Sequence, residues 1–381
     1  MAQINNTKAV SFIEFGYERY GLLMKQCYFA DYTIGQDAYL KIEKVCSPLG
    51  KRVLIVGGET ALSKSIEKLK AAMTAFDIVD VVIYGKECTR SLAESLYNNY
   101  KDKDIDFVVG VGGGKALDTS KCLADLLGVR IATVPTIVST CAASSALAVM
   151  YTEEHAFDGF WYFDKPAYHV FIDTEILIEA PKEFFRAGIG DTLAKYYEVE
   201  FSARGREKTF NDEMGISISR MCNIPLIESG AEAYEDVKKG KITEKFEQVS
   251  LIILVSTGMV SMLVNHDFNG GVAHAIFYGL TNIEGFEEKF RHGDVVGYAT
   301  AVQLMVDKKE EDAIKIGNLL KDLGVEATLS ERGIDVDFEY LKPYLTSALN
   351  DPDMDVIPYE ITEEMIFDAI VKMEDMFGGK A

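Results

Sequence analysis

Two histidines, His274 and His292, stand where small neighbours would let a metal ion or a substrate come close. His274 lies in Gly-Gly-Val-Ala-His-Ala, and His292 is followed by Gly293 and a helical pattern. Imidazole is a common ligand of zinc and iron(II). A third ligand is available in Asp191, which follows Gly-Ile-Gly at the start of a helix-like run, although an aspartate there also suits an N-cap. The residue types are therefore compatible with a metal centre, and helix capping is the alternative for Asp191.

A second feature that could bind a ligand is a glycine triplet, Gly112, Gly113 and Gly114. It separates an apolar, strand-like run, Phe107–Val111, from a helical pattern that begins at Lys115. Glycines let a ligand approach the backbone, and the free N–H groups of a helix N-terminus bind anions. The triplet therefore indicates either a phosphate site or a plain tight turn.

The remaining histidines and the cysteines suggest no further centre. His155 lies in a polar loop, His169 in a strand and His266 in a turn. The six cysteines show no Cys-x-x-Cys pair and no framework spacing, so we expect reduced thiols. Residues Met1–Val10 lack the pattern of a secretion signal, and no run approaches the length needed to cross a bilayer. These features predict a cytoplasmic protein.

The length and charge of the chain narrow the classes of partner. At 381 residues the chain is long enough for two domains. It carries 39 basic and 60 acidic residues, a formal net charge of −21. This charge argues against nucleic acid or an anionic membrane as a partner, but it leaves room for a small anionic ligand at a local positive site. We expect a small-molecule substrate and a homo-oligomer.

The elements that must position these residues differ between the two halves of the chain. In the first half, apolar strand-like runs alternate with helix-like runs. Such alternation predicts a Rossmann-like parallel sheet with helices on both faces and a ligand crevice at the carboxyl ends of its strands. The predicted strands are Lys51–Val56, Val79–Tyr84, Phe107–Val111, Arg130–Val134 and Tyr168–Ile172, and the predicted helices are Ala61–Phe76, Thr89–Asn99 and Lys115–Leu127.

Strand-like alternation largely disappears beyond Pro181. We therefore expect a nucleotide-binding α/β domain over residues 1–182 and an all-helical domain, carrying the metal-ligand candidates, over residues 183–381. Residues 1–27 form an extra N-terminal segment in which Ser11–Lys25 suits a short helix. The main helical periods are Pro181–Ala203, Asn211–Glu228, Lys245–Val264, Val272–Leu280 and Gly293–Val306.

Several motifs, in one order, closely resemble those of the iron-containing alcohol dehydrogenase superfamily. The best match is to the glycerol dehydrogenase branch, with similarity to its hydroxycarboxylate dehydrogenase-like members, and 17 residues separate the two histidines, as in that pattern. The resemblance runs from about Tyr32 to beyond Gln303 and implies a dehydroquinate synthase-like architecture. The motifs are Gly-Val-Gly-Gly-Gly-Lys-Ala-Leu-Asp-Thr-Ser-Lys at 110–121, Val-Pro-Thr-Ile-Val-Ser-Thr at 134–140, Gly-Ile-Gly-Asp-Thr-Leu-Ala-Lys at 188–195, Ala-His-Ala-Ile at 273–276 and His-Gly-Asp-Val-Val-Gly-Tyr at 292–298.

This resemblance implies specific roles for residues of this chain. Asp191, His274 and His292 would bind one divalent metal, zinc or iron(II). The pyrophosphate of NAD(H) or NADP(H) would be held by Gly112, Gly113, Gly114, Lys115 and Ala116. The nicotinamide part of the cofactor would be lined by Thr136, Ser139, Ser145, Leu147 and Tyr151.

Three positions depart from the family pattern. Cys141 stands where glycerol dehydrogenases carry an aspartate that contacts the polyol. Phe277 replaces a second histidine, so a proton relay through that position is excluded. Gly57 replaces the carboxylate that binds the adenosine ribose, which favours NADP(H) or dual use unless Glu59 turns inward.

The sequence therefore predicts a metal-dependent oxidoreductase that acts on a small 2-oxo or 2-hydroxy acid. Cys141 removes a negative charge from the substrate site, and Lys195, four residues after Asp191 on the same helix face, could neutralise the substrate carboxylate. A surface salt bridge is the alternative for Lys195, and a buried spacer is the alternative for Cys141. The alternative functions are an NAD-dependent glycerol or diol dehydrogenase, a lyase of dehydroquinate synthase type, and a cofactor-binding protein without turnover.

Overall fold

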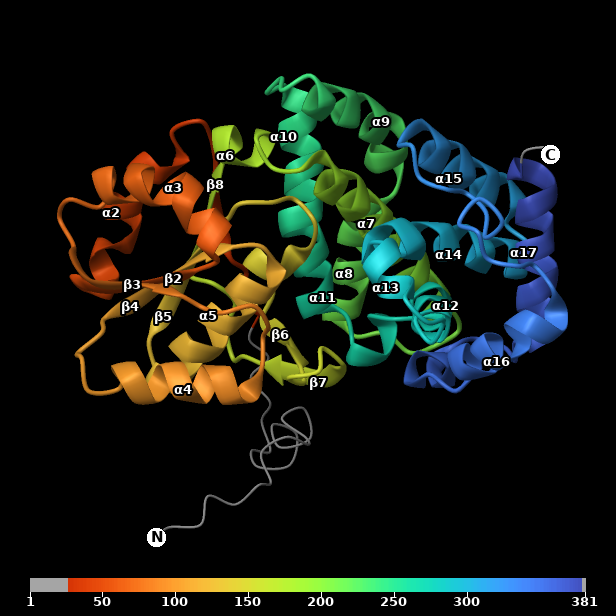
Figure 1. The fold of residues 1–381 in the computed structure, drawn as a ribbon, viewed down its shortest axis with the longest axis horizontal. Coiled ribbons are helices and arrows are strands. Elements are labelled where there is room, and N and C mark those ends of the chain that lie inside the picture. Colours follow the sequence, from red (N-terminus) through yellow and green to blue (C-terminus); the bar gives the residue numbers. More distant parts are fainter. Residues whose placement is uncertain (1–26, 379–381) are drawn as a thin grey trace, which may run out of the picture.

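The structure, a computed structural model, describes residues 27–378. Its first part is built on a six-stranded parallel sheet, as the alternating pattern predicts (Figure 1). The strand order is β1–β8–β5–β4–β2–β3. The strands are β1 (Asp31–Gly35), β2 (Arg52–Gly57), β3 (Asp77–Ile83), β4 (Phe107–Gly112), β5 (Arg130–Pro135) and β8 (His169–Asp173).

Helices cover the sheet because its central strands are apolar on both faces. Every residue of β4 is buried, which requires a layer on each side. Of the covering helices, α3, α5 and α6 begin directly after β2, β4 and β8, at the edge where the glycine turns lie. Figure 1 shows α3 and α4 on different sides of the sheet. The covering helices are α2 (Ile42–Cys46), α3 (Glu59–Ala71), α4 (Arg90–Tyr100), α5 (Gly114–Leu127) and α6 (Thr174–Ile178).

The second part is helical throughout, as expected. Its long central helices, α7 and α14, carry buried residues along most of their length, so they form the middle of this part. The helices are α7 (Lys182–Ser202), α8 (Phe210–Ser219), α9 (Ile224–Lys238), α10 (Glu244–Leu251), α11 (Thr257–Leu263), α12 (Val272–Leu280), α13 (Phe286–Lys289), α14 (His292–Val306), α15 (Glu310–Asp322), α16 (Phe338–Leu349) and α17 (Glu363–Phe377).

Two elements differ from the sequence prediction. An antiparallel hairpin of β6 (Leu147–Tyr151) and β7 (Phe157–Tyr162) occupies a stretch in which the sequence analysis predicts no strand. The helix predicted over Asn211–Glu228 is two helices, because the chain turns at Asn223 and restarts with Pro225 in the first turn of α9.

One helical stretch corrects the expectation that no run is long enough to cross a bilayer. Residues Glu244–Leu263 are long and apolar enough to do so by length and composition, and 61% of the most apolar window is buried inside the structure. The segment comprises α10, a π-helical turn at Ile252–Ser256 and α11. Such burial is what a core helix of the helical part requires.

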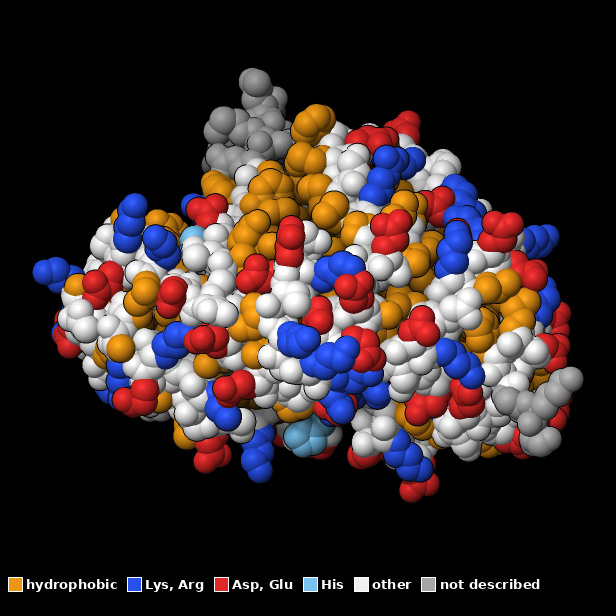
Figure 2. All heavy atoms as spheres, turned by 90° about the horizontal axis from the view of Figure 1, so that it is seen from above, with side chains coloured by type: hydrophobic (Ala, Val, Ile, Leu, Met, Phe, Trp, Pro, Cys, Tyr) orange, Lys and Arg blue, Asp and Glu red, His pale blue; other side chains and the backbone are white. Residues whose placement is uncertain are grey.

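The domain boundary predicted between residues 182 and 183 falls one residue inside α7 and stays a prediction. Buried residues of both parts, such as Leu54 and Val108 of the sheet and Leu193 of α7, belong to one hydrophobic cluster. The helix predicted at Ser11–Lys25 lies outside the described residues. On one face of the molecule, acidic and basic side chains are interspersed, and hydrophobic side chains gather near its middle (Figure 2).

Candidate active site

Close packing of α7 against α14 brings the predicted metal ligands together. A Cβ atom on Gly190 would lie 2.1 Å from the carbonyl oxygen of Gly293, and one on Gly293 would lie 1.9 Å from the carbonyl oxygen of Ala187. Only glycines allow this approach. Asp191 lies in the middle of α7, whose N-cap is Pro181, so the N-capping alternative for Asp191 is wrong.

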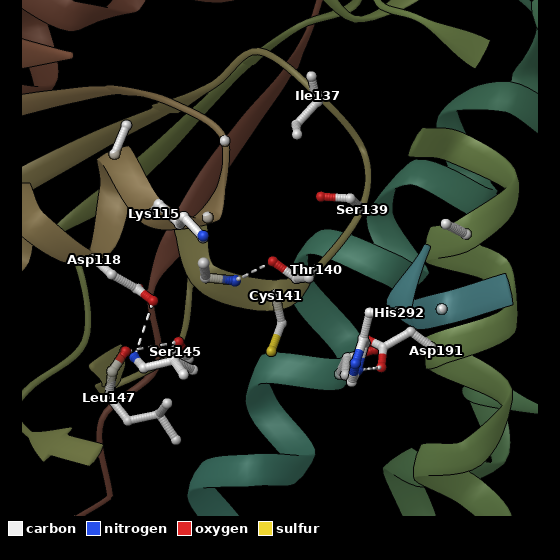
Figure 3. A pocket seen from close by; sticks show the side chains of 18 of the residues that line it. Lys115, Asp118, Ile137, Ser139, Thr140, Cys141, Ser145, Leu147, Asp191 and His292 are labelled. Carbon is white, nitrogen blue, oxygen red and sulfur yellow. Dashed lines mark hydrogen bonds and ion pairs between the residues drawn. The ribbon is translucent and has the colours of Figure 1, made fainter. Parts of the chain in front are cut away.

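The three candidate ligands meet at one point. Asp191 Oδ1 lies 3.1 Å from His292 Nε2 and 3.6 Å from His274 Nε2. His292 is the first residue of α14, and His274 is in the first turn of α12. One ligand atom from each residue lies within 4.8 Å of the other two. Figure 3 shows Asp191 and His292 side by side at one wall of the cleft.

The donor set fits a divalent metal ion. Nitrogen and oxygen ligands about 2.0–2.1 Å from a tetrahedral ion lie roughly 3.3–3.4 Å apart, and the distances of 3.1 and 3.6 Å from Asp191 Oδ1 to the two imidazoles bracket that value. Two imidazoles and one carboxylate suit zinc or iron(II) and leave positions for a substrate.

Glu198 is a candidate functional residue that the sequence analysis missed. It lies two turns after Asp191 on α7 and is fully buried. Its carboxylate accepts hydrogen bonds from the backbone N–H of His274 (2.9 Å) and from His274 Nδ1 (2.7 Å). This pairing leaves Nε2 of His274 free to face Asp191, the arrangement by which a carboxylate orients a metal-binding histidine.

Charges at the triad favour a proton on His274 until a metal replaces it. Burial alone would lower the pKa of His274, but Glu198 and Asp191 raise it to about 10. Burial opposes ionisation of Asp191, yet its hydrogen bonds to His274 and His292 lower the pKa of Asp191. A metal ion would displace the proton of His274, so metal affinity should rise with pH.

The glycine turn forms the start of α5 as predicted. Gly112 ends β4 with φ +146°, a conformation that favours glycine, and a Cβ there would lie 2.8 Å from that of Ala116. Gly113 is the N-cap of α5, so the first amides of the helix have no partner within it. These amides can bind an anion such as a pyrophosphate.

One cleft of about 1,940 Å³ joins the glycine turn to the triad. Figure 3 shows Lys115, Ser145 and Leu147 on one side of Cys141, and Asp191 and His292 on the other. Of the predicted cofactor and substrate residues, the cleft is lined by Gly113, Gly114, Lys115, Ala116, Thr136, Ser139, Ser145, Leu147, Tyr151, Cys141 and Lys195.

Two predicted cofactor residues do not line the cleft. Gly57 is buried, and a Cβ there would lie 2.6 Å from the carbonyl oxygen of Val111. Gly112 turns the chain, and its carbonyl oxygen accepts a hydrogen bond from Thr136 N. The cleft residue next to β2 is Gly58, where an added Cβ would make only ordinary van der Waals contacts, the nearest at 3.6 Å from the ring of Tyr84.

Buried charges fix the segment expected to line the nicotinamide. Lys121 Nζ, almost fully buried, forms an ion pair with Asp118 Oδ1 (2.9 Å) and donates to the carbonyl oxygen of Leu147. Asp118 Oδ2 accepts a hydrogen bond from Val149 N (3.0 Å). Asp118 and Lys121 both belong to the glycine motif at 110–121, and only the structure shows that they hold β6 in place.

Lys115 and His155 meet at a carboxylate that the sequence analysis did not single out. Glu87 Oε2 lies 2.6 Å from Lys115 Nζ and 2.7 Å from His155 Nδ1. Lys115 Nζ also lies 4.6 Å from the ring centre of Tyr151. His155 is thus a largely exposed cleft residue that ties the hairpin loop to the loop between β3 and α4.

Comparison with known proteins identifies the family of the chain. Residues 30–173 match the family model of iron-containing alcohol dehydrogenase. A glycerol dehydrogenase of Escherichia coli is 30% identical over 313 residues, which cover 80% of this chain and 84% of that enzyme. The chain belongs to the iron-containing alcohol dehydrogenase family. Family membership confirms the expected reaction class, that of an alcohol or hydroxycarboxylate dehydrogenase.

Other members of the iron-containing alcohol dehydrogenase family are similar over most of their length. Hydroxycarboxylate dehydrogenase A of Escherichia coli K12 is 31% identical over 287 residues, covering 75% of this chain and 78% of that enzyme. The crystal structure of glycerol dehydrogenase from Schizosaccharomyces pombe superposes with a TM-score of 0.82 at 25% identity, covering 94% of each chain. The two-part architecture predicted from the resemblance is therefore confirmed.

The helix crossing in this family member predicts a stability effect. Gly293→Ala should lower the free energy of unfolding by about 1–3 kcal/mol, because the added methyl group overpacks the contact with Ala187. It should also weaken metal binding by separating His292 from Asp191. Thermal unfolding and a metal titration check both effects. Gly230→Ala on α9, whose added methyl would meet nothing closer than 3.5 Å, should leave metal binding unchanged and should not lower the free energy of unfolding, because alanine is the better helix former.

Proposed function

We propose that this chain transfers a hydride between a nicotinamide cofactor and a small 2-oxo or 2-hydroxy acid. The proposal assigns one zinc or iron(II) ion to Asp191, His274 and His292 and the cofactor to the glycine turn of α5. Its support is the single cleft that runs from that turn to the triad. A bound divalent ion supplies Lewis acidity, which stabilises the alkoxide character of the reacting oxygen.

The choice of substrate rests on Lys195, a cation beside the triad that forms no ion pair in the described part of the chain. Lys195 lies one turn after Asp191 and lines the cleft. Its Nζ donates to the carbonyl oxygen of Asn269 (2.9 Å) and to Asn269 Oδ1 (3.3 Å). Within residues 27–378 no carboxylate lies within ion-pair distance of Lys195, and Asp353 of the same cleft acts on its charge only from farther away. A substrate carboxylate could form a charge-assisted hydrogen bond with this ammonium group.

Cys141 supports the same choice. Its thiol lies in the cleft, and burial raises its pKa, so the side chain is neutral at pH 7. An aspartate there would repel a substrate carboxylate and would accept hydrogen bonds from a polyol. Figure 3 shows the sulfur of Cys141 between the cofactor side of the cleft and the triad.

Two variants test the substrate proposal. Lys195→Ala should raise KM for 2-oxo acids about tenfold, the loss of one charge-assisted contact, and should change KM for neutral aldehydes much less. Cys141→Asp should reduce kcat/KM for 2-oxo acids and increase turnover of glycerol. Steady-state kinetics with 2-oxobutyrate, glycolaldehyde and glycerol measure both.

The matched control is Lys182→Ala, which removes an exposed lysine from the first turn of the same helix, outside the cleft. It should leave all three substrates unaffected. If wild-type protein prefers glycerol, or if both cleft variants treat acids and neutral carbonyls alike, the charge argument is wrong. The glycerol or diol dehydrogenase function, which the name of the Escherichia coli relative favours, would then stand.

For the cofactor we propose NADP(H) or dual use. The position of the ribose-binding carboxylate is sterically closed at Gly57, and the adjoining cleft residue is also glycine, Gly58. Glu59, exposed and at the start of α3, also lines the cleft and is the residue that would permit NAD(H). No carboxylate at residues 57 or 58 opposes a 2′-phosphate.

Gly58→Asp should shift the preference toward NAD(H) about tenfold, roughly 1.4 kcal/mol. The residue is the N-cap of α3, where aspartate is well tolerated, so the fold should be retained. Gly58→Asn is the control, because it has the same shape without the charge. Kd values for NADH and NADPH measure the shift. Equal shifts in the two variants would show that charge at this position does not select the cofactor.

A further inference from the structure

Aromatic side chains form a continuous wall beside the metal triad. The ring of Phe277, one turn after His274 on α12, lies 4.4 Å from the ring of His292 at 79°, an edge contact. Its neighbour Tyr278 lies 6.3 Å from His274, centre to centre. Both side chains line the cleft.

Aromatic residues of the β6–β7 hairpin, in the first part of the chain, extend this wall. Phe157, at the start of β7, stacks on Tyr278 with ring centres 6.4 Å apart and an angle of 27°. Phe160 packs on Phe157 at 5.2 Å. Phe157 is 52% exposed although its ring lines the cleft, so it has surface free to cover a ligand. We call Phe157, Phe277 and Tyr278 the aromatic wall.

The aromatic wall and Lys195 offer a substrate two different surfaces. Lys195 approaches the triad from α7 and attracts a carboxylate, whereas the wall approaches from α12 and β7 and offers ring carbons. Hydroxyl groups placed against Phe277 and Phe157 would lose water without gaining a hydrogen bond, which is unfavourable. An apolar substituent in the same place gains from leaving water.

We propose that the group attached to the reacting carbonyl, opposite the carboxylate, is apolar: a branched aliphatic or aromatic substituent that rests on the aromatic wall. The inference rests on the proposed function, since it takes the carboxylate as the other end of the substrate. It names substrates larger and less polar than pyruvate, glycerol or glycolaldehyde.

A substrate series tests the inference. Metal-loaded protein is assayed by NAD(P)H oxidation with pyruvate, 2-oxobutyrate, 4-methyl-2-oxopentanoate and phenylpyruvate, and with acetaldehyde and 3-methylbutanal. An apolar pocket favours a substrate with one more methylene group by roughly 10-fold to 200-fold in kcat/KM. We therefore expect kcat/KM to rise at least about tenfold from pyruvate to 4-methyl-2-oxopentanoate or phenylpyruvate.

A variant links the series to the wall. Phe157→Ala should reduce the ratio of kcat/KM for 4-methyl-2-oxopentanoate to that for pyruvate about fivefold, the value of one aromatic contact. Phe210→Ala is the matched control, since it truncates an 80% exposed phenylalanine on α8 outside the cleft, and it should not change the ratio. Phe157 is half-exposed, so its loss should not prevent folding.

The outcomes separate the two proposals. Activity that rises with apolar substituents among acids, and falls in Phe157→Ala alone, supports both. Acids turned over with no gain from pyruvate to phenylpyruvate, or an unchanged ratio in Phe157→Ala, overturn the aromatic wall and leave the proposed function standing. If the acids are not turned over, and kcat/KM for 3-methylbutanal is at least tenfold higher than for acetaldehyde, the proposal of a substrate carboxylate is overturned. The contact between an apolar substituent and the aromatic wall is then supported.

Discussion

His292→Ala is expected to lower kcat/KM by about a thousandfold or more. This loss is well beyond the roughly 10–100-fold loss typical of a residue that only hydrogen-bonds a metal ligand. The variant removes one of the three proposed protein ligands, so the metal content should fall far below one ion per chain. The side chain of His292 is 42% exposed, so its truncation should barely affect folding. Activity, metal content by elemental analysis and thermal unfolding, measured together, check the prediction.

The control for His292→Ala is His266→Ala. His266 also lines the cleft and is exposed, but it lies outside the triad. Its removal should leave metal content at the wild-type level and should cost little activity. A His292→Ala protein that retains both its metal and most of its turnover would show that the ion, if bound, is held elsewhere.

Glu198→Gln should weaken metal binding about 10–100-fold. The carboxylate accepts two hydrogen bonds, one from the backbone N–H and one from Nδ1 of His274. A glutamine has one acceptor oxygen, so it cannot satisfy both donors, and the imidazole loses the partner that directs Nε2 toward the metal. Competition with a chelator of known affinity measures the change directly.

Excess metal distinguishes the role of Glu198 from that of a ligand. Saturating zinc or iron(II) should restore most of the kcat of Glu198→Gln but not that of His292→Ala. Glu200→Gln, on the same helix but paired with Arg204 and Lys309, serves as the control and should bind metal normally. Unchanged metal affinity in Glu198→Gln would contradict an orienting role.

The strong periodic patterns were sufficient to predict most of the fold. The run Phe107–Val111 followed by glycines became β4 and the N-terminus of α5. The hairpin β6–β7 was not predicted, because Leu147–Tyr151 follows a stretch of small hydroxyl residues and Phe157–Tyr162 is partly exposed. Its apolar residues pack on Cys122 and Cys88, contacts that no local pattern shows.

The sequence singled out the candidate metal ligands but not the residues that support them. Gly190 before Asp191 suggested a helix start, whereas the glycine serves the close crossing with Gly293 inside a continuous helix. Glu198 looks like any other helical glutamate in sequence. Only its complete burial against His274, a long-range contact, identifies it.

Stoichiometric metal reconstitution tests the central claim most directly. Protein stripped of metal is titrated anaerobically with iron(II), and separately with zinc, while bound metal and NAD(P)H oxidation are measured on the same samples. The proposed function predicts no turnover without metal and activity that rises in proportion to bound ion up to one ion per chain, with Asp191, His274 and His292 as the proposed ligands. Full turnover by protein that contains far less than one ion per chain would contradict the account.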